Sequence, residues 1–303
     1  ALRILDTEDL HFLRQYREAV LKKTTSNLYS DVTKREIAAI YRCDLSLIIS
    51  EKEMELLLKT FRLPTEILHY LPFLETPVSK NEIENLPSFS ERKHLIFFGN
   101  FKHRPNVDAV VYLKKDIWPL LKNILPDAEI HIYGAYATQQ LLEFNNPRDR
   151  FFVHDWVEDL DKILQHSRLL VAPLRFGAGL KGKIIQAIRN GTVFVTTAIG
   201  AEGIFPLSYS NGVGDNLDAF VALVNKLYND EQQWLKRQRD AFEVLNKQFD
   251  SSKYSAQFFS KLATLFNNLS SHRQSNFVGL MLHFHLHQST KYLSKWIEEK
   301  HKN

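Results

Sequence analysis

The apolar residues of this chain fall into two kinds of pattern that alternate along much of its length. Short continuous apolar runs predict buried strands at residues 94–99, 129–133, 151–154, 169–174 and 193–197. Between the runs, apolar residues recur every three or four positions, which predicts helices, and Pro119 is expected to break the first of them. This alternation predicts a parallel sheet with helices on both faces.

The pattern divides the chain into regions. Residues 1–75 show three short strands with helices between them, and the last helix is expected to begin with a capping box of Ser50 and Glu53. Residues 76–93 are polar and contain two prolines, which indicates a linker. We therefore predict a partial α/β domain over 1–75, a linker over 76–93, a complete Rossmann-like domain over 94–250, and helices over 251–303.

Composition limits the possible functions. The chain has 303 residues, of which 44% are hydrophobic and 24% charged, as expected for a globular protein of two domains. The net charge of +4 permits contact with an anionic substrate or a membrane surface, and the absence of a clustered basic face argues against nucleic acid. Cys43 is the only cysteine, which excludes an internal disulfide and fits a reducing, cytoplasmic location. No apolar run is long enough to span a membrane.

The most informative stretch is residues 168–203, where a buried strand, a glycine-rich loop, a helix and a second strand follow one another. The loop leads into a helix N-terminus, where free backbone N–H groups and the helix dipole favour a phosphate. Its glycines allow the backbone to approach a ligand closely, and Lys181 and Lys183 add positive charge. We interpret the loop as a site for an anionic ligand, and specifically for the diphosphate of a nucleotide.

Several known motifs share these residues. Gly177, Gly179 and Gly182 have the spacing of the dinucleotide fingerprint, and Glu202 stands where a ribose-binding acid would follow. That fingerprint belongs to the first strand of a domain, however, whereas this loop follows the fourth. The P-loop pattern fails because Ile184 replaces the hydroxyl residue that binds Mg²⁺. The remaining interpretations are the donor site of a sugar-nucleotide transferase and a plain turn with two solvated lysines.

Other glycines follow strands in the same way. Gly99–Asn100 and Gly134 come directly after two predicted strands, so we expect them to meet the glycine-rich loop at one crevice. On the helix after the loop, Lys183, Gln186 and Asn190 share one face by their spacing.

Two groups of histidines have alternative interpretations. His283 and His287 have a spacing that suits a shared metal, but no third ligand is evident, and an amphipathic helix docked on the protein explains them equally. His11 follows a strand and lies close to Asp6 and Asp9 in sequence. It is either a group that faces a substrate or an ordinary surface histidine.

Longer segments carry a family resemblance. They are residues 97–110, 117–119, 130–134, 171–183 and 196–203, with weaker matches at 5–14 and 38–53. In these segments the chain resembles a glycosyltransferase of family 4, the group 1 type, with the two-Rossmann GT-B architecture. The resemblance covers most of residues 1–250. It implies an α/β, GT-B-like fold with one complete Rossmann-like C-terminal domain, part of the acceptor-side domain, and C-terminal helices.

The resemblance also implies a reaction. It implies transfer of a sugar from a nucleotide sugar to a glycan or a lipid-linked acceptor, with retention of configuration and with no cofactor or obligatory metal. It places Lys181 and Lys183 near the donor diphosphate, and we predict these lysines and His11 as catalytic residues. The enzyme would work in the cytoplasm or at the inner face of the membrane. The predicted donor site consists of Gly99, Asn100, Gly134, Phe176, Gly177, Ala178, Gly179, Leu180, Gln186 and Glu202.

The chain departs from the family in two respects. The family has paired acids eight residues apart, and these positions hold Ala178 and Gln186 here. Gln186 is a neutral acceptor for a ribose hydroxyl, so we expect Gln186→Glu to strengthen nucleoside-diphosphate binding. The family's first domain also begins earlier, so we expect a fragment or a decayed member. The alternatives are a nucleotide-sugar-binding pseudoenzyme or scaffold, and an NAD-dependent oxidoreductase.

Overall fold

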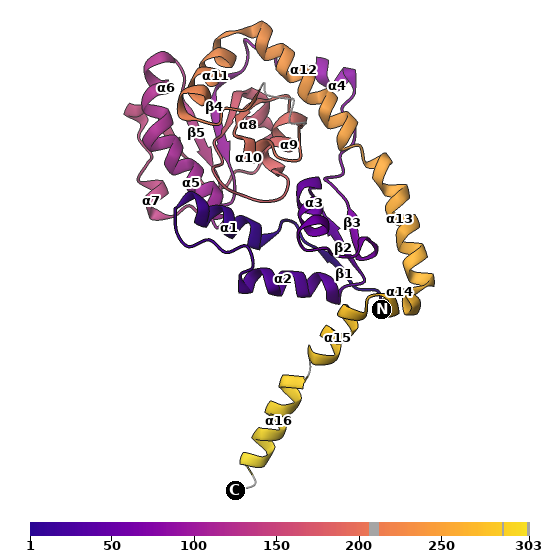
Figure 1. The fold of residues 1–303 in the computed structure, drawn as a ribbon. Helices are drawn as coiled ribbons and strands as arrows, with labels where there is room; N and C mark the ends of the chain where they lie inside the picture. The colour runs from indigo at the N-terminus through magenta and orange to yellow at the C-terminus, as the bar shows by residue number, and fades with distance from the viewer. Residues whose placement is uncertain (206–211, 287, 302–303) are drawn as a thin grey trace. The chain divides into compact units, whose positions relative to one another are not determined.

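The computed structural model describes residues 1–205, 212–286 and 288–301. The chain forms two compact α/β units, each with its own parallel sheet (Figure 1). The first consists of Ala1–Val20, Thr25–Pro72 and Ser252–Asn303, and the second of Leu21–Thr24 and Phe73–Ser251. The C-terminal helices, which the sequence analysis set apart, therefore group with the first unit, and the expected linker groups with the second.

The first unit contains a three-stranded sheet in the order β1 (Ile4–Asp6), β2 (Leu45–Ile48) and β3 (Leu68–Tyr70). Leu45 and Ile48 are fully buried because β2 is the central strand. Apolar runs and helical spacing correctly predicted all three strands and the helices between them. These helices are α1 (His11–Leu21), α2 (Asp31–Arg42) and α3 (Glu51–Lys59).

Four C-terminal helices complete the first unit, and an ion pair shows how they attach. Arg273 of the second helix donates to both carboxylate oxygens of Asp44 at 2.8 and 2.9 Å, and the backbone of Arg3 donates to the same group at 2.8 Å. Burial alone would raise the pKa of Asp44, but these hydrogen bonds outweigh it and lower the pKa. The helices are α13 (Ser251–Asn267), α14 (Leu269–Ser275), α15 (Phe277–Leu286) and α16 (Gln288–Lys300).

The second unit contains a five-stranded parallel sheet in the order β6-β5-β4-β7-β8. The chain starts at the centre with β4, adds β5 and β6 on one side, and returns to add β7 and β8 on the other. The direction of strand addition therefore reverses between β4 and β7. The strands are β4 (Lys93–Phe98), β5 (Ile130–Tyr133), β6 (Phe151–Val153), β7 (Ser167–Ala172) and β8 (Val193–Thr196).

The helices of the second unit follow the predicted alternation. Pro119 does not end the first long helix, because a π-helical turn over Leu113–Ile117 leads directly into an α-helix from Trp118 that has Pro119 in its first turn. The helices are α4 (Lys80–Glu84), α5 (Arg104–Tyr112), α6 (Trp118–Ile124), α7 (Gln139–Leu142), α8 (Leu160–His166), α9 (Gly182–Arg189), α10 (Ala198–Ala201), α11 (Leu217–Asn229) and α12 (Glu231–Gln248).

The predicted capping box was wrong, and another occurs elsewhere. Ser50 makes no side-chain capping bond at the start of α3, and Glu53 instead accepts the backbone N–H of Leu10 at 2.9 Å. A complete capping box of Ser79 and Glu82 begins α4, within the segment expected to be a linker. The polar composition of that segment thus reflects a short capped helix.

The backbones of β4 and β5 come very close where the two strands end. A Cβ atom added to Gly134 would lie 2.0 Å from the carbonyl oxygen of Gly99, so the backbone would have to move. A Cβ added to Gly182 would meet only the ring of Phe73, at an ordinary distance of 3.4 Å.

We therefore expect Gly134→Ala to destabilise the second unit by about 3 kcal/mol, at the upper end of overpacking effects. Gly182→Ala is the matched control and should change stability by less than about 1 kcal/mol, because the helix accepts alanine there. Urea unfolding of both variants measures the difference. Equal midpoints would contradict the close approach of the two strands.

Candidate functional site

The candidate site lies at the carboxyl ends of three adjacent strands of the second unit. Gly99 follows β4, Gly134 follows β5, and the loop beginning near Gly177 follows β7. Strand β4 lies between the other two, and the N–H of Gly99 donates to the carbonyl of Tyr133 at 3.0 Å. The structure thus brings together the ends that the sequence predicted to converge. Open α/β sheets bind ligands where the strand order reverses, as it does here between β4 and β7.

The glycine-rich loop is held in place by its own lysine. Gly179 has a φ of 61°, in the left-handed region that glycine tolerates best. The buried ammonium of Lys181 donates to the carbonyl oxygens of Ala178 at 3.2 Å and Gly179 at 2.5 Å. The side chains of Phe176, Ala178 and Leu180 are all buried in the core. Three of the predicted donor-binding residues therefore contribute packing, and Lys181 fixes the path of the loop.

Lys183 occupies a different environment, although it lies only two residues further along. Its ammonium donates to Oδ1 of Asn106 at 2.6 Å and lies 4.0 Å from the centre of the Phe97 ring. A Cβ added to Gly99 would lie 3.0 Å from the same nitrogen. No carboxylate of the described residues pairs with it. Burial lowers the pKa of Lys183 to about 7, and the charge of Lys181 contributes.

Gln186 is held by an acid from a neighbouring helix. Its amide donates to Oδ1 of Asp161 at 3.0 Å, and the amide of Asn190 donates to the same oxygen at 2.7 Å. Asp161 lies in the first turn of α8 and is exposed. The position where the family resemblance placed a ribose-binding acid therefore holds an amide in direct contact with a carboxylate.

The remaining predicted residues have separate positions. Asn100 orders the turn after β4, since its side chain accepts the N–H of Lys102 at 2.8 Å. Glu202 directly follows α10, and Ile199 of that helix lies against Gly177.

His11 belongs to the first unit and begins α1. Its ring is half exposed and lies 3.3 Å from Asp9 and 3.9 Å from Glu36. Asp9, which is close to His11 in sequence, therefore contacts the ring, and Glu36 of α2 adds a second acid. Its catalytic role stays a prediction.

Three residues of the site were not predicted from the sequence. Asn106 and Phe97 hold the ammonium of Lys183, and Asp161 holds Gln186. Phe97 and Asn106 lie within the segment that carries the family resemblance. That segment indicated the family without indicating which of its side chains meet the lysine.

A histidine cluster at the other end of β4 could in principle hold a metal. Among the residues that the structure describes, His94, Glu129 and His131 offer ligand atoms within 4.8 Å of one another. The N–H of Glu129 donates to Nδ1 of His94 at 3.2 Å, however, so neutral His94 carries its proton on Nε2, the nitrogen that faces the carboxylate. Lys93 and Lys162 also line the adjacent cavity of about 380 Å³ and would repel a cation. The geometry therefore favours a hydrogen-bonded network.

The other histidine pair lies only partly within the described residues. His283 donates from Nε2 to the carbonyl oxygen of Arg42 at 2.7 Å, which fits a helix docked on the first unit. His287 lies outside the described residues.

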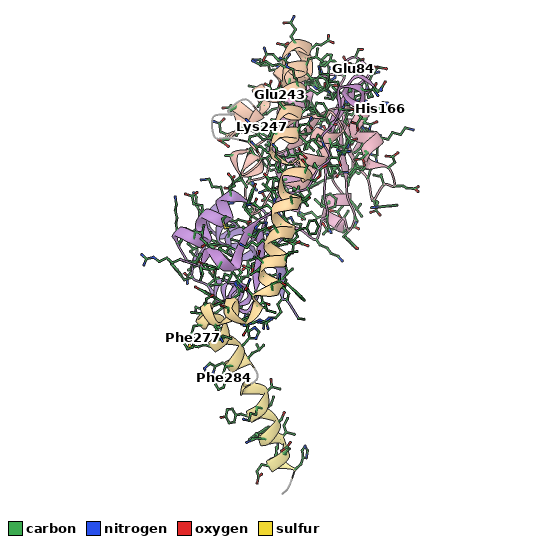
Figure 2. All side chains as sticks on the ribbon, turned by 90° about the vertical axis from the view of Figure 1, so that its right-hand side faces the viewer. Glu84, His166, Glu243, Lys247, Phe277 and Phe284 are labelled. Carbon is green, nitrogen blue, oxygen red and sulfur yellow. The ribbon has the colours of Figure 1, made fainter. Side chains whose placement is uncertain are left out.

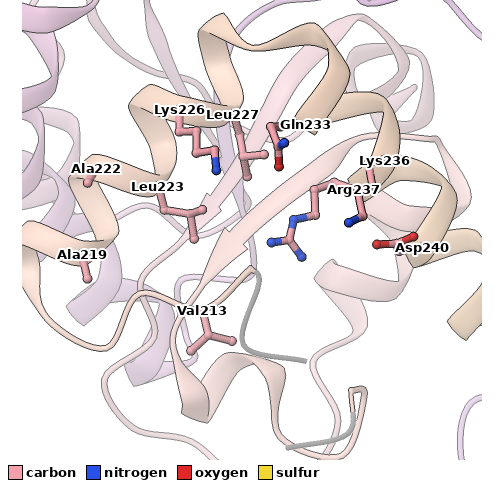
Figure 3. Close-up of a pocket in the computed structure, with 10 residues that line it drawn as sticks. All are labelled: Val213, Ala219, Ala222, Leu223, Lys226, Leu227, Gln233, Lys236, Arg237 and Asp240. Carbon is pink, nitrogen blue, oxygen red and sulfur yellow. The ribbon is translucent and has the colours of Figure 1, made fainter. Parts of the chain in front are cut away.

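A second cavity, of about 440 Å³, lies between α11 and α12 (Figure 3). Its polar lining is formed mainly by Lys226, Lys236, Arg237 and Asp240. None of the predicted site residues lines it.

The histidine network predicts a pH dependence of stability. Burial lowers the pKa of His94, His131 and His154 below the ordinary value of 6.5, so the folded protein keeps these rings neutral. As the pH falls through about 6.5, the unfolded chain takes up protons first, and the folded state loses stability until its own histidines titrate.

We expect urea midpoints to decrease over this range and His131→Phe to reduce the decrease. Phenylalanine can keep the stacking of this ring on Phe152, whose centroid lies 4.9 Å away. Exposed His166 serves as the control, and His166→Phe should leave the pH dependence unchanged. The same slope in all three proteins would contradict the assignment.

Comparison with known proteins supports a transferase. Residues 92–230 match the family model for group 1 glycosyl transferases, and this range includes all five strands from β4 to β8 and the helices between them. An uncharacterized 44.6 kDa protein in the cps region of Klebsiella pneumoniae is 23% identical over 234 residues. That match covers 72% of this chain and 56% of the Klebsiella protein.

Solved structures with low sequence identity show the fold. A mutant of S. aureus TarM, in complex with Fondaparinux, alpha-GlcNAc-glycerol and UDP, is 15% identical with a TM-score of 0.63, over 78% of this chain and 47% of TarM. Anabaena HepE, in complex with UDP and glucose, is 12% identical with a TM-score of 0.62, over 86% of this chain and 71% of HepE. The fold is therefore GT-B-like, as expected. The chain spans about half the length of TarM and of the Klebsiella protein.

Proposed function

We propose that this chain takes part in retaining transfer of a sugar from a nucleotide-sugar donor to a glycan or lipid-linked acceptor, as a family 4 glycosyltransferase. The observation that carries the proposal is the ammonium of Lys183, which lies beside Gly99 and has no carboxylate partner among the residues that the structure describes. It lies where the strand order reverses, which is where such sheets bind ligands. The match to group 1 glycosyl transferases and the UDP bound in the TarM and HepE structures support the same conclusion.

In this proposal the donor diphosphate is the anionic partner of the Lys183 ammonium. Because Gly99 and Gly134 have no side chains, the two strand ends pack closely and the ammonium of Lys183 can lie beside the backbone of Gly99. Helix α9 begins at Gly182 and adds the partial positive charge of its N-terminus. Lysine and helix terminus together supply the positive charge that a metal supplies elsewhere, so the proposal includes no cofactor and no obligatory metal.

The wider predictions belong to the same proposal. They are a cytoplasmic location, a glycan or lipid-linked acceptor, and peripheral contact with a membrane surface. A nucleotide-sugar-binding pseudoenzyme would share the donor site but would not turn over the sugar nucleotide. The oxidoreductase alternative has less support, because the glycine-rich loop follows β7, the fourth strand of its sheet in chain order.

Competition binding with UDP, GDP and NAD tests the proposal directly. We expect one of the nucleoside diphosphates to bind and NAD to compete poorly. If NAD binds and neither UDP nor GDP binds, the assignment of a sugar-nucleotide donor site is overturned. Release of a nucleoside diphosphate from a sugar nucleotide then separates an active transferase from a pseudoenzyme.

Lys183→Ala should weaken binding of a nucleoside diphosphate by roughly tenfold or more, the loss expected for one charge-assisted contact. Binding of the nucleoside should change little, because Lys183 would contact only the phosphates. Since the pKa of Lys183 is about 7 in the free protein, diphosphate binding should take up a proton above that pH. Affinity should therefore decrease as the pH rises above about 7.

Calorimetric titration with UDP and uridine over this pH range measures both effects. The Lys183→Ala variant also serves as the control for the pH series. Its affinity should depend on pH only through the titration of the ligand itself. Equal weakening of UDP and uridine, or an unchanged pH slope in the variant, would show that Lys183 only supports the fold.

The contact between Gln186 and Asp161 changes what a substitution at this helix should do. Gln186→Glu would place a second carboxylate about where an amide now lies 3.0 Å from Asp161, so the two charges would repel each other. The gain in affinity expected from the sequence should therefore not appear in that variant. In the same proposal, Asp161 supplies the acid for the ribose that position 186 lacks.

A double substitution tests this directly. Asp161→Asn should weaken the binding of UDP severalfold, since a hydrogen bond to a neutral acceptor contributes about 1 kcal/mol less than one to a charged acceptor. Gln186→Glu should also weaken it. The double variant restores one carboxylate and one amide in contact, so its affinity should return toward the original value. The difference in affinity between UDP and its 2′-deoxy analogue should likewise decrease in each single variant and return toward the original value in the double variant. If Asp161→Asn leaves the affinity for both ligands unchanged, Asp161 only connects α8 to α9.

A further inference from the structure

Helix α15 is unusually apolar, and only part of its surface is used within the first unit. One side packs against α2, where the amide of Asn276 donates to the carbonyl of Tyr41 at 2.8 Å. Gly279 lies so close to the same carbonyl that an added Cβ would be 2.2 Å away. The rest of the helix surface is exposed. Phe277 and Phe284 are 65% and 67% exposed, and Figure 2 shows both side chains projecting from the helix.

Helix α16 also exposes large apolar side chains. Tyr292, Leu293, Trp296 and Ile297 are each between 42% and 64% exposed. Their spacing places them on one face of the helix, while Lys291 and most other polar residues lie on the opposite face. The ammonium of Lys300 lies 5.0 Å from the centre of the Trp296 ring, so this lysine lies along the apolar face. The helix is therefore amphipathic with both faces in solvent.

An apolar surface of this size needs a partner. A short helix with no tertiary contacts is only marginally stable in water, and large exposed apolar patches mark interaction surfaces. A coiled coil with a second copy would need apolar residues at heptad positions along both helices. The heptad that includes Phe277, Leu280 and Phe284 continues to Lys291, Ser294 and Glu298, so the exposed phenylalanines do not belong to a continuous apolar seam.

The residue types instead match a lipid surface. Phenylalanines exposed on α15, and a tyrosine and a tryptophan on one face of α16 with Lys300 beside them, are typical of helices that lie in the plane of a bilayer. Helix α16 carries three lysines against two glutamates, which favours anionic lipids modestly. None of the described helices is long and apolar enough to cross a membrane.

We infer that α15 and α16 form a surface that binds a bilayer containing anionic lipids, with the exposed aromatic residues inserted at the interface. The inference does not depend on the donor site, and it goes beyond the general prediction of peripheral contact because it assigns the segment. Membrane binding through this segment and nucleotide binding can fail independently.

Cosedimentation of the full 303-residue chain with phosphatidylcholine vesicles, with and without phosphatidylglycerol, tests it. We expect binding to the anionic vesicles and weaker binding to the neutral ones. The double variant Phe284→Ser and Trp296→Ser should lose about tenfold or more, since each large apolar side chain contributes substantially when it leaves water. Both residues lie outside the core, and circular dichroism checks that the fold is retained.

Trp156→Ser is the matched control, because Trp156 is 68% exposed but belongs to the second unit. It should bind vesicles like the original chain. No binding to anionic vesicles would overturn the inference, and so would equal binding by the double variant. Sedimentation velocity identifies the competing occupant: a dimer that the double variant abolishes, without vesicle binding, would show that a second copy covers these helices.

Discussion

An ammonium withdrawn from water, with no carboxylate partner in the part of the chain that the structure describes, is the constraint on which the carboxyl edge of the second sheet depends. Removing a charge from water is costly, and the lowered pKa of Lys183, about 7, reflects that cost. The face of the Phe97 ring and the amide oxygen of Asn106 offset part of it, but neither carries a formal charge. Glycine at position 99 leaves room for the side chain of Asn106 and for the ammonium, which a Cβ there would meet at 2.6 and 3.0 Å. An anion would therefore gain more at this point than at an exposed lysine, because the charge it meets is poorly solvated and incompletely paired.

The two lysines of the loop show how position decides role. Lys181 satisfies its ammonium with two loop carbonyls, so the glycine-rich loop keeps its path through its own hydrogen bonds. Lys183 donates instead to the side-chain amide oxygen of Asn106 and extends to β4 and α5. A fixed loop and a cation with no carboxylate partner among the described residues are separate requirements of an anion site, and Lys181 and Lys183 meet them separately. Charge counted along the sequence cannot distinguish these two roles.

Patterns within a few residues predicted most of the fold, and long-range contacts explain the failures. Continuous apolar runs identified the strands because parallel strands covered on both faces are apolar on both sides. The capping box at α3 failed because Glu53 bonds to Leu10, far away in sequence. The expected linker contains Arg92, which is fully buried and donates to the carbonyls of Pro87, Leu164 and Asn190. An arginine in a polar segment appears solvated until the fold supplies those acceptors.

Contacts between residues far apart in sequence also limited the prediction of the site, and this affects how a missing acid should be interpreted. Glycine spacing predicted where backbone would approach a ligand, because that property depends on the local chain alone. The partners of Lys183 and Gln186 could not be predicted, since Asn106 lies 77 residues and Asp161 25 residues away. An acid absent from position 186 suggested a weakened site, yet a carboxylate lies in direct contact with that position. The chemistry of a pocket depends on which groups surround it and not on which residue carries them. A substitution at one aligned position therefore indicates decay only when no neighbouring element supplies the same group.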